Sequence, residues 1–324
     1  MFNRLSRILG PAIALSFGLM LPTPPSATAQ ATPPKQPNHG PGGRDYVHRG
    51  FQIEYHEEGS EAEAFWIFQP KKPLPTSPTP VVVLVHGWSY TPPQSYAYWL
   101  AHMVARGNTV IYPVYRGRFT SFSRVTENAL IGVKAAFAEL ARPGHSPIDT
   151  DRFAIAGHSI GAMAAANLAH LAASEGLPEP RALLTISPYV SGLLSLSDIP
   201  STCLALITEG VDDETVDPDD PRLIWSRLQH IPEDSRDFLT YPSDDHGAPP
   251  IITSHNYCTA YLGSPDQLGA LEFYGTWKLF DALMNAAFYG EDREYALGNT
   301  PQQRWMGRWS DGVAVREPTV TDNP

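Results

Sequence analysis

The chain has 324 residues, 42% of them hydrophobic, and a formal net charge of −11 at pH 7. This length is enough for one large domain with a well-buried core. The acidic balance argues against a nucleic acid or an anionic membrane surface as the target, and it favours solubility. No exposed apolar stripe can be assigned in the sequence, so we expect a monomer.

The first 29 residues are organised like a secretory signal peptide. Arg4 and Arg7 form a basic start, residues 8–21 an apolar centre, and residues 27–29 (Ala-Thr-Ala) a small-residue cleavage site. The apolar centre is shorter than the roughly 20 residues that a membrane span needs. We therefore expect a cleaved leader at residues 1–29, no membrane span, and a secreted or periplasmic protein. An uncleaved anchor is the alternative.

The segment after this leader, residues 30–43, is rich in proline and has no aromatic residue. Such a composition predicts a disordered tether. Residues 44–324 are then expected to form a single domain with a helical C-terminal extension. In an oxidising compartment, its cysteines Cys203 and Cys258 either pair or remain buried free thiols, and the sequence leaves both possibilities open.

Strands are predicted where short apolar runs lie between turn residues. Residues 51–55 and 62–68, separated by a Glu-Glu-Gly-Ser turn, favour an antiparallel hairpin at one edge of a sheet. The run Val-Val-Val-Leu-Val at residues 81–85 is typical of a strand that is buried on both faces. Further strands are predicted at residues 108–115, 152–156, 182–186, 203–208 and 237–241.

Helices are predicted between these strands by apolar residues at helical spacing. They cover residues 94–106, 121–141, the segment from Ser159 to Gly176, and one or two helices within 268–289; beyond Gly290 no element is predicted. This alternation implies right-handed crossovers and a mostly parallel, twisted sheet with helices on both faces. Only sixteen residues separate Ile186 from Cys203, so no separate cap domain fits there.

The segment Gly157-His158-Ser159-Ile160-Gly161 follows an apolar strand and precedes an alanine-rich helix. A Gly-x-Ser-x-Gly in this context predicts a nucleophile elbow, a sharp turn that exposes the serine at the carboxyl end of the strand. The glycines are needed because larger side chains two positions before and after the serine would collide with the neighbouring backbone. Ser159 is therefore the candidate nucleophile.

The order of elements, the His86-Gly87 pair after the strand at 81–85, and the Gly-His-Ser-Ile-Gly elbow together resemble the α/β-hydrolase superfamily. The resemblance spans roughly residues 51–289 and is to secreted esterases of the dienelactone-hydrolase, cutinase-like and lipase type. It implies an α/β-hydrolase fold and a serine, acid, histidine catalytic triad in that chain order. It also implies an oxyanion hole made by the backbone N–H groups of Trp88 and Ile160.

The acid and the base are expected in loops after later strands. Family members often carry Gly-x-x-Asp-x-x-Val in the first of these loops, and this pattern selects Asp213; its acidic neighbours Asp212 and Glu214 remain alternatives. His246, in the polar segment after the strand at 237–241, is the expected base, and His255 is held in reserve. A near-neutral histidine can accept the serine proton and return it to the leaving group, while a carboxylate fixes its tautomer.

The sequence favours a secreted serine hydrolase that cleaves small or polymeric carboxylic esters through an acyl-enzyme on Ser159. Tyr90 and Tyr189 are expected to line the substrate pocket, and His158 to be a packing residue. No group of residues shows metal-ligand spacing and no phosphate-binding glycine loop is present, so we expect no metal and no cofactor. The alternatives are a serine peptidase of the same fold and a non-catalytic binding module.

Overall fold

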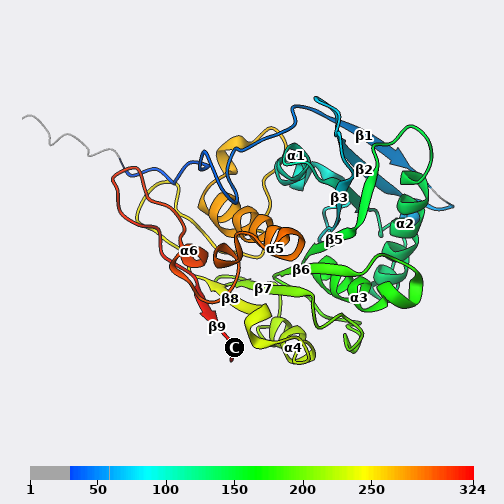
Figure 1. Ribbon diagram of the computed structural model, residues 1–324. Helices are drawn as coiled ribbons and strands as arrows, with labels where there is room; N and C mark the ends of the chain where they lie inside the picture. The colour runs from blue at the N-terminus through cyan, green and yellow to red at the C-terminus, as the bar shows by residue number, and fades with distance from the viewer. Residues whose placement is uncertain (1–29, 58) are drawn as a thin grey trace, which may run out of the picture. The chain divides into compact units, whose positions relative to one another are not determined.

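The computed structural model describes residues 30–57 and 59–324, so the signal peptide predicted at residues 1–29 lies outside the described residues. The described chain is built on a nine-stranded sheet with the order β1-β2-β4-β3-β5-β6-β7-β8-β9 (Figure 1). The strands are β1 (Phe51–His56), β2 (Phe65–Pro70), β3 (Thr79–Val85), β4 (Thr109–Pro113), β5 (Ile148–His158), β6 (Pro180–Ile186), β7 (Leu204–Gly210), β8 (Arg236–Tyr241) and β9 (Thr319–Thr321).

The centre of this sheet is parallel, and its edges are antiparallel. Strands β4, β3, β5, β6, β7 and β8 pair in parallel, whereas β1 pairs with β2, β2 with β4, and β8 with β9 in antiparallel fashion. The predicted edge hairpin and the mostly parallel sheet are both confirmed. Alternate residues of β3 enter different apolar clusters, Val82 and Leu84 on one face and Val81 and Val83 on the other, as its β-branched run predicts.

Helices cover both faces of the sheet. They are α1 (Ala97–Ala105), α2 (Val125–Leu140), α3 (Ile160–Glu175), α4 (Asp219–Arg227), α5 (Lys278–Tyr289) and α6 (Pro301–Arg304), with a π-helix at Leu271–Trp277 directly before α5. Short 3-10 turns lie at Glu61–Glu63, Pro93–Tyr96, Phe122–Arg124, Glu233–Ser235, Pro265–Gln267 and Arg293–Tyr295.

The two faces have separate apolar cores. Trp99 of α1 and Leu283 of α5 belong to one core, while Val133 of α2, Leu168 of α3 and Trp225 of α4 belong to the other. Figure 1 shows α1 and α5 on one side of the sheet and α2, α3 and α4 on the opposite side. Within the described part of the chain, no helix is both long enough and apolar enough to cross a membrane.

Residues 31–43 do not form the disordered tether that their composition predicts. The Ala248 N–H donates to the Ala31 carbonyl at 2.8 Å, and the Gly42 N–H donates to Asp281 of α5 at 2.8 Å. Gly42 has φ +75°, and a Cβ atom there would lie 2.1 Å from the Phe273 carbonyl oxygen. The segment is held by backbone hydrogen bonds and close backbone approach rather than by apolar side chains, which is why its composition concealed it.

The two cysteines are free thiols buried on opposite faces of the sheet. Cys203 lies in the core beneath α2, α3 and α4, and Cys258 lies in the core beneath α1 and α5. Because the sheet separates them, no disulfide joins these two residues.

Candidate active site

Ser159 occupies a strained turn between β5 and α3. Its φ and ψ are 57° and −130°, and α3 begins at the next residue. A Cβ atom on Gly157 would lie 2.2 Å from the Gly161 carbonyl oxygen, and one on Gly161 would lie 2.2 Å from the His86 carbonyl oxygen. These approaches are the physical reason for both glycines, and the strand, turn and helix stand as the sequence predicts.

His255 links Ser159 to a carboxylate. Its Nε2 lies 2.9 Å from the Ser159 Oγ, and its Nδ1 lies 2.8 Å from Asp213 Oδ2. An ionised carboxylate can only accept, so Nδ1 carries the proton and Nε2 presents its lone pair to the serine hydroxyl. The three side chains therefore form a continuous chain of hydrogen bonds.

Asp213 is the acid that the structure brings to this histidine. Its side chain is 4% exposed, and its Oδ1 accepts a hydrogen bond from the Thr215 N–H at 2.9 Å. Burial alone would raise the pKa of Asp213, but the hydrogen bonds from His255 and from the Thr215 N–H outweigh it and lower that pKa below its usual value. Its alternatives lie elsewhere: Asp212 accepts from Ser243, and Glu214 is exposed.

The loop after β3 is fixed through its carbonyl groups. The hydroxyl of Tyr115 donates to the His86 carbonyl, and a guanidinium N–H of Arg116 donates to the Trp88 carbonyl, each at 2.7 Å. The Gly87 carbonyl accepts from the Tyr90 N–H at 3.0 Å. A trans peptide directs its N–H opposite to its carbonyl, so the Trp88 N–H points away from Tyr90. Ile160 is the first residue of α3, where helical N–H groups have no intrahelical partner.

Comparison with known protein families matches residues 82–255 to a family described as having the alpha/beta hydrolase fold. The match covers more than half of the 324 residues, contains Ser159 and Asp213, and ends at His255. The chain belongs to this family. A search of curated proteins finds no match to it.

In this hydrolase the structure does not bring His246 to Ser159, and the prediction that made it the base is corrected here. The His246 Nε2 lies 2.7 Å from Asp311 Oδ2, and its side chain is 35% exposed. Asp244 and Ile251 exchange two backbone hydrogen bonds of 2.8 and 2.9 Å. Residues 245–250 thus form a loop whose two ends are held together by the Asp244–Ile251 pair, and His246 lies on this loop.

The chain comes close to Ser159 only after this loop. A Cβ atom on Gly210, at the end of β7, would lie 2.0 Å from the Thr253 carbonyl oxygen, so the chain passes against the end of β7 just before His255. Two signals in the sequence favoured His255: the consecutive prolines Pro249 and Pro250, which extend the loop, and its place downstream of both Ser159 and Asp213. The loop was longer than the prediction assumed.

His158 does more in the hydrolase than pack. Its Nε2 lies 2.8 Å from the His255 carbonyl oxygen and its Nδ1 lies 2.7 Å from the Tyr96 hydroxyl, which accepts from the Gly87 N–H at 3.1 Å. The carbonyl can only accept, so Nε2 carries the proton and Nδ1 accepts from Tyr96. Burial lowers the pKa of His158 to about 3 and keeps it neutral.

Aromatic side chains lie beside Ser159. The Tyr189 N–H donates to the Ser159 carbonyl at 3.1 Å, and the Tyr189 ring lies 5.6 Å from the ring of Phe122. Phe122 in turn packs 4.4 Å from the Trp88 ring and is 42% exposed. Tyr90 is half-buried, and its ring contacts those of Tyr96 and His158 at 5.9 and 6.0 Å. These residues give the neighbourhood of Ser159 an aromatic, partly solvated surface.

Proposed function

We propose that this hydrolase is a serine esterase that cleaves carboxylic esters through an acyl-enzyme on Ser159, with His255 as the base and Asp213 as the acid. The observation that carries the proposal is the pair of short contacts that His255 makes, 2.9 Å to the Ser159 hydroxyl and 2.8 Å to the Asp213 carboxylate. A serine hydroxyl needs such a base because it is a weak nucleophile while it keeps its proton.

In the first half of the proposed reaction, the Ser159 Oγ attacks the ester carbonyl carbon as His255 Nε2 takes the hydroxyl proton. The carbon–oxygen bond to the alcohol then breaks, and the departing oxygen receives that proton. In the second half, His255 takes a proton from water, the water oxygen attacks the acyl carbon, and Ser159 leaves with the proton restored. Asp213 stabilises the imidazolium that forms in each half.

The negative oxygen of each tetrahedral intermediate requires preorganised donors. We assign this role to the N–H groups of Trp88 and Ile160. The assignment is supported by the fixed carbonyls of the 86–88 loop, by the direction of the Trp88 peptide, and by the position of Ile160 as the first residue of α3.

The aromatic surface formed by Trp88, Phe122 and Tyr189 favours an apolar or aryl acyl group. Tyr189 is tied to the Ser159 backbone, so an acyl chain attached to Ser159 would lie near this surface. Tyr90 is proposed as a second contact, on the side of His158. We also propose that residues 1–29 direct secretion, which mass analysis of the N-terminus from a secreting host would test.

The test of the esterase activity is hydrolysis of p-nitrophenyl esters of increasing acyl length by the purified protein. Ser159→Ala is expected to lower kcat by roughly 10⁵-fold or more, and Asp213→Asn by about 10⁴-fold. Labelling of the wild type by a fluorophosphonate should disappear in Ser159→Ala. Equal hydrolysis by wild type and Ser159→Ala would refute the proposal, and cleavage of p-nitroanilides in preference to esters would favour a peptidase instead.

The identity of the base is tested by two matched substitutions. His255→Asn is expected to lower kcat by at least about 10⁴-fold, because Ser159 loses its proton acceptor. His246→Asn removes a histidine from the same stretch of chain, whose side chain contacts only Asp311 and the Trp309 ring, so its kcat should stay within about twofold of the wild-type value. The reverse outcome would reinstate His246 as the base.

A further inference from the structure

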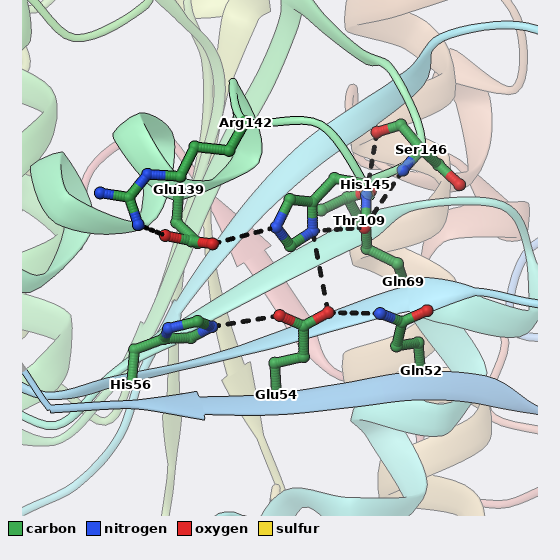
Figure 2. Close-up of polar contacts among 9 residues, drawn as sticks. All are labelled: Gln52, Glu54, His56, Gln69, Thr109, Glu139, Arg142, His145 and Ser146. Atoms are coloured by element: carbon green, nitrogen blue, oxygen red, sulfur yellow. Dashed lines mark hydrogen bonds and ion pairs between the residues drawn. The ribbon is translucent and has the colours of Figure 1, made fainter.

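A second cluster of ionisable side chains lies at the opposite end of β5 from Ser159. Glu54 and His56 project from one face of β1, Glu139 comes from the last turn of α2, and His145 from the loop before β5. Figure 2 shows these four side chains pointing toward one another. Ligand atoms of Glu54, Glu139 and His145 lie within 4.8 Å of one another. Residues Ile148 to Gly157 of β5 run alongside the seven residues of β3, so the length of the strand, on the order of 20 Å, separates the cluster from the esterase site.

The hydrogen bonds around Gln69 determine where the proton of His145 sits. The Gln69 Nε2 donates to the Ser146 carbonyl at 3.1 Å and its Oε1 accepts from the Ser146 N–H at 3.3 Å, so the amide can adopt only this orientation. The Gln69 Oε1 also lies 3.1 Å from the Nδ1 of His145. This oxygen can only accept, and Nδ1 therefore carries a proton.

The other ring nitrogen of His145 then faces a carboxylate. Its Nε2 lies 3.4 Å from Glu139 Oε1, while Arg142 is bonded to the other oxygen of Glu139. The His145 side chain is 6% exposed and that of Glu139 is 14% exposed. A neutral imidazole would point its lone pair at this carboxylate oxygen, which is unfavourable unless a proton or a metal cation lies between them.

We propose that Glu54, Glu139 and His145 bind a divalent zinc ion, with His56 completing the site. Imidazole and carboxylate ligands suit zinc, which binds them at about 2.0–2.2 Å; a tetrahedral site of that size has ligand atoms about 3.4 Å apart. The distance of 3.4 Å between His145 Nε2 and Glu139 Oε1 matches such an edge. His56 Nε2 lies 3.1 Å from Glu54 Oε2, so the two residues reach the site together.

The surrounding residues have the arrangement that metal sites use to orient a histidine. Gln69 holds the Nδ1 proton, as carbonyl and carboxylate groups do beside metal-bound imidazoles. Glu54 Oε1 lies 3.8 Å from His145 Nδ1, so the Glu54 carboxylate has to turn toward the Nε2 side of the ring to become a ligand. The ligand atoms of Glu54, Glu139 and His145, at up to 4.8 Å from one another, have to close by up to about 1.4 Å, which the soft terminal torsions of the two glutamates allow. Sequence spacing gives no sign of this site because its residues lie at 54, 56, 139 and 145 and meet only in the fold.

The consequence of zinc binding would be structural. The ion would join the edge strand β1 to α2 and to the loop before β5, where the ion pairs that His145 makes with Glu54 and Glu139 otherwise connect these three segments. If zinc binds only to the folded chain, the midpoint temperature of unfolding should rise as zinc is added. This inference does not depend on the esterase proposal, because the metal would lie far from Ser159.

The experiment measures zinc binding to the full chain after treatment with a chelator, by competition with a fluorescent zinc indicator. One zinc per chain with a dissociation constant of about 1 µM or lower is expected. Glu139→Gln and Glu54→Gln, which keep side-chain size, should each weaken binding at least about tenfold. X-ray absorption of the zinc-loaded wild type should show nitrogen and oxygen ligands including imidazole, and this measurement needs no variant to fold.

Two control variants should retain the zinc. His39→Gln removes an exposed histidine that is paired with Asp45 alone at 2.6 Å, and His255→Gln removes the histidine of the esterase site. The proposal is overturned if the wild type binds no zinc in this range, if the Glu139 and Glu54 variants bind as tightly as wild type, or if sulfur ligands appear.

Discussion

His158 lies between the base and the oxyanion loop of the proposed esterase. It donates to the His255 carbonyl and, through Tyr96, is connected to the Gly87 N–H. Its main chain also carries the nucleophile, because Ser159 is the next residue. One buried side chain thus fixes the relative positions of the nucleophile, the base and the loop of Trp88, so we assign it a positioning role.

We predict that His158→Phe lowers kcat by about 10- to 100-fold and changes KM by less than about threefold. Phenylalanine fills the space but leaves the Tyr96 hydroxyl and the His255 carbonyl without their partner, and small displacements of catalytic groups cost this much. Steady-state hydrolysis of a p-nitrophenyl ester measures both constants.

Two further variants separate positioning from general destabilisation by His158→Phe. His158→Gln retains a donor and an acceptor and should recover part of kcat. His170→Asn changes a histidine near the other end of α3, which accepts from the Asp198 N–H, and should leave kcat unchanged. An unaltered kcat in His158→Phe would show that the side chain only packs.

Among the elements, α1 and α5 and the N-terminal segment meet at Asp281. Its Oδ2 accepts hydrogen bonds from His102 of α1 at 2.9 Å and from the Gly42 N–H at 2.8 Å, and it forms an ion pair with Arg106 Nε at 3.1 Å; its side chain is 1% exposed. Burial would raise the pKa of Asp281, but the positive charges of His102 and Arg106 and these hydrogen bonds lower it. The carboxylate is a buried anion that depends on all three partners.

We predict that Asp281→Asn lowers the free energy of unfolding by about 3–5 kcal/mol, because it leaves the positive charge of Arg106 without its partner. Urea unfolding at neutral pH measures this change. Asp234→Asn is the matched control, because it removes a carboxylate that is 84% exposed and lies 3.9 Å from Arg293. The urea concentration at the midpoint of unfolding should hardly change in this variant. Equal midpoints for both variants would contradict the role of Asp281.

Glu272, in the π-helix before α5, is a buried acid whose pKa is raised, whereas that of Asp281 is lowered. Its side chain accepts from the Gly269 N–H at 2.8 Å, and burial raises its pKa to about 8. Since an unfolded glutamate titrates near 4.5, the folded chain must keep an extra proton between pH 4.5 and 8, and stability falls as pH rises through this window.

We predict that Glu272→Gln raises the free energy of unfolding at pH 8 by a few kcal/mol and changes it little at pH 4.5. The amide keeps an acceptor for the Gly269 N–H and has no proton to lose. Urea unfolding of both proteins at the two pH values measures the difference. Equal gains at both pH values would show that the effect is not linked to the carboxyl proton.

Some elements of the fold follow directly from local patterns. The β-branched run of β3 reflects burial on both faces, and the two glycines around Ser159 reflect a sharp turn. Both constraints act within a few residues of the chain. Helix α4 was not predicted, because it is short, contains Pro221 and buries few apolar residues, including Ile224 and Trp225. Strand β9 has only three residues and depends on its pairing with β8.

In the candidate site, too, the residues governed by local patterns were predictable and the others were not. Ser159 directly follows β5 and Asp213 lies three residues after β7, where the fold leaves little freedom. His255 lies beyond the loop of residues 245–250, whose length depends on the contact between Asp244 and Ile251. No local sequence pattern reveals that contact. The cluster of Glu54, Glu139 and His145 was beyond sequence analysis, because its members meet only through the pairing of β1 with the sheet and the packing of α2.

For the whole molecule, the response of stability to acid depends on groups that the fold keeps in unusual protonation states. His86 and His158 are fully buried, and burial lowers the pKa of each to about 3 from an ordinary 6.5. Below pH 6.5 the unfolded chain takes up these two protons and the folded chain does not, so stability falls as pH decreases. Glu272 acts in the opposite direction down to pH 4.5.

These opposing contributions predict a specific slope between pH 6.5 and 4.5. Each proton is worth about 1.4 kcal/mol per pH unit, so His86, His158 and Glu272 by themselves contribute a net loss of about 1.4 kcal/mol per unit of acidification; burial also raises the pKa of Asp237 and of Asp220, which reduces the total loss in both proteins. In Glu272→Gln the compensating proton is absent, so its loss should exceed that of the wild type by about 1.4 kcal/mol per unit. Urea unfolding of both proteins at pH 6.5, 5.5 and 4.5 measures the two slopes. Parallel slopes would mean that Glu272 is already ionised in the folded protein, since only a carboxyl that stays protonated there can offset the histidines.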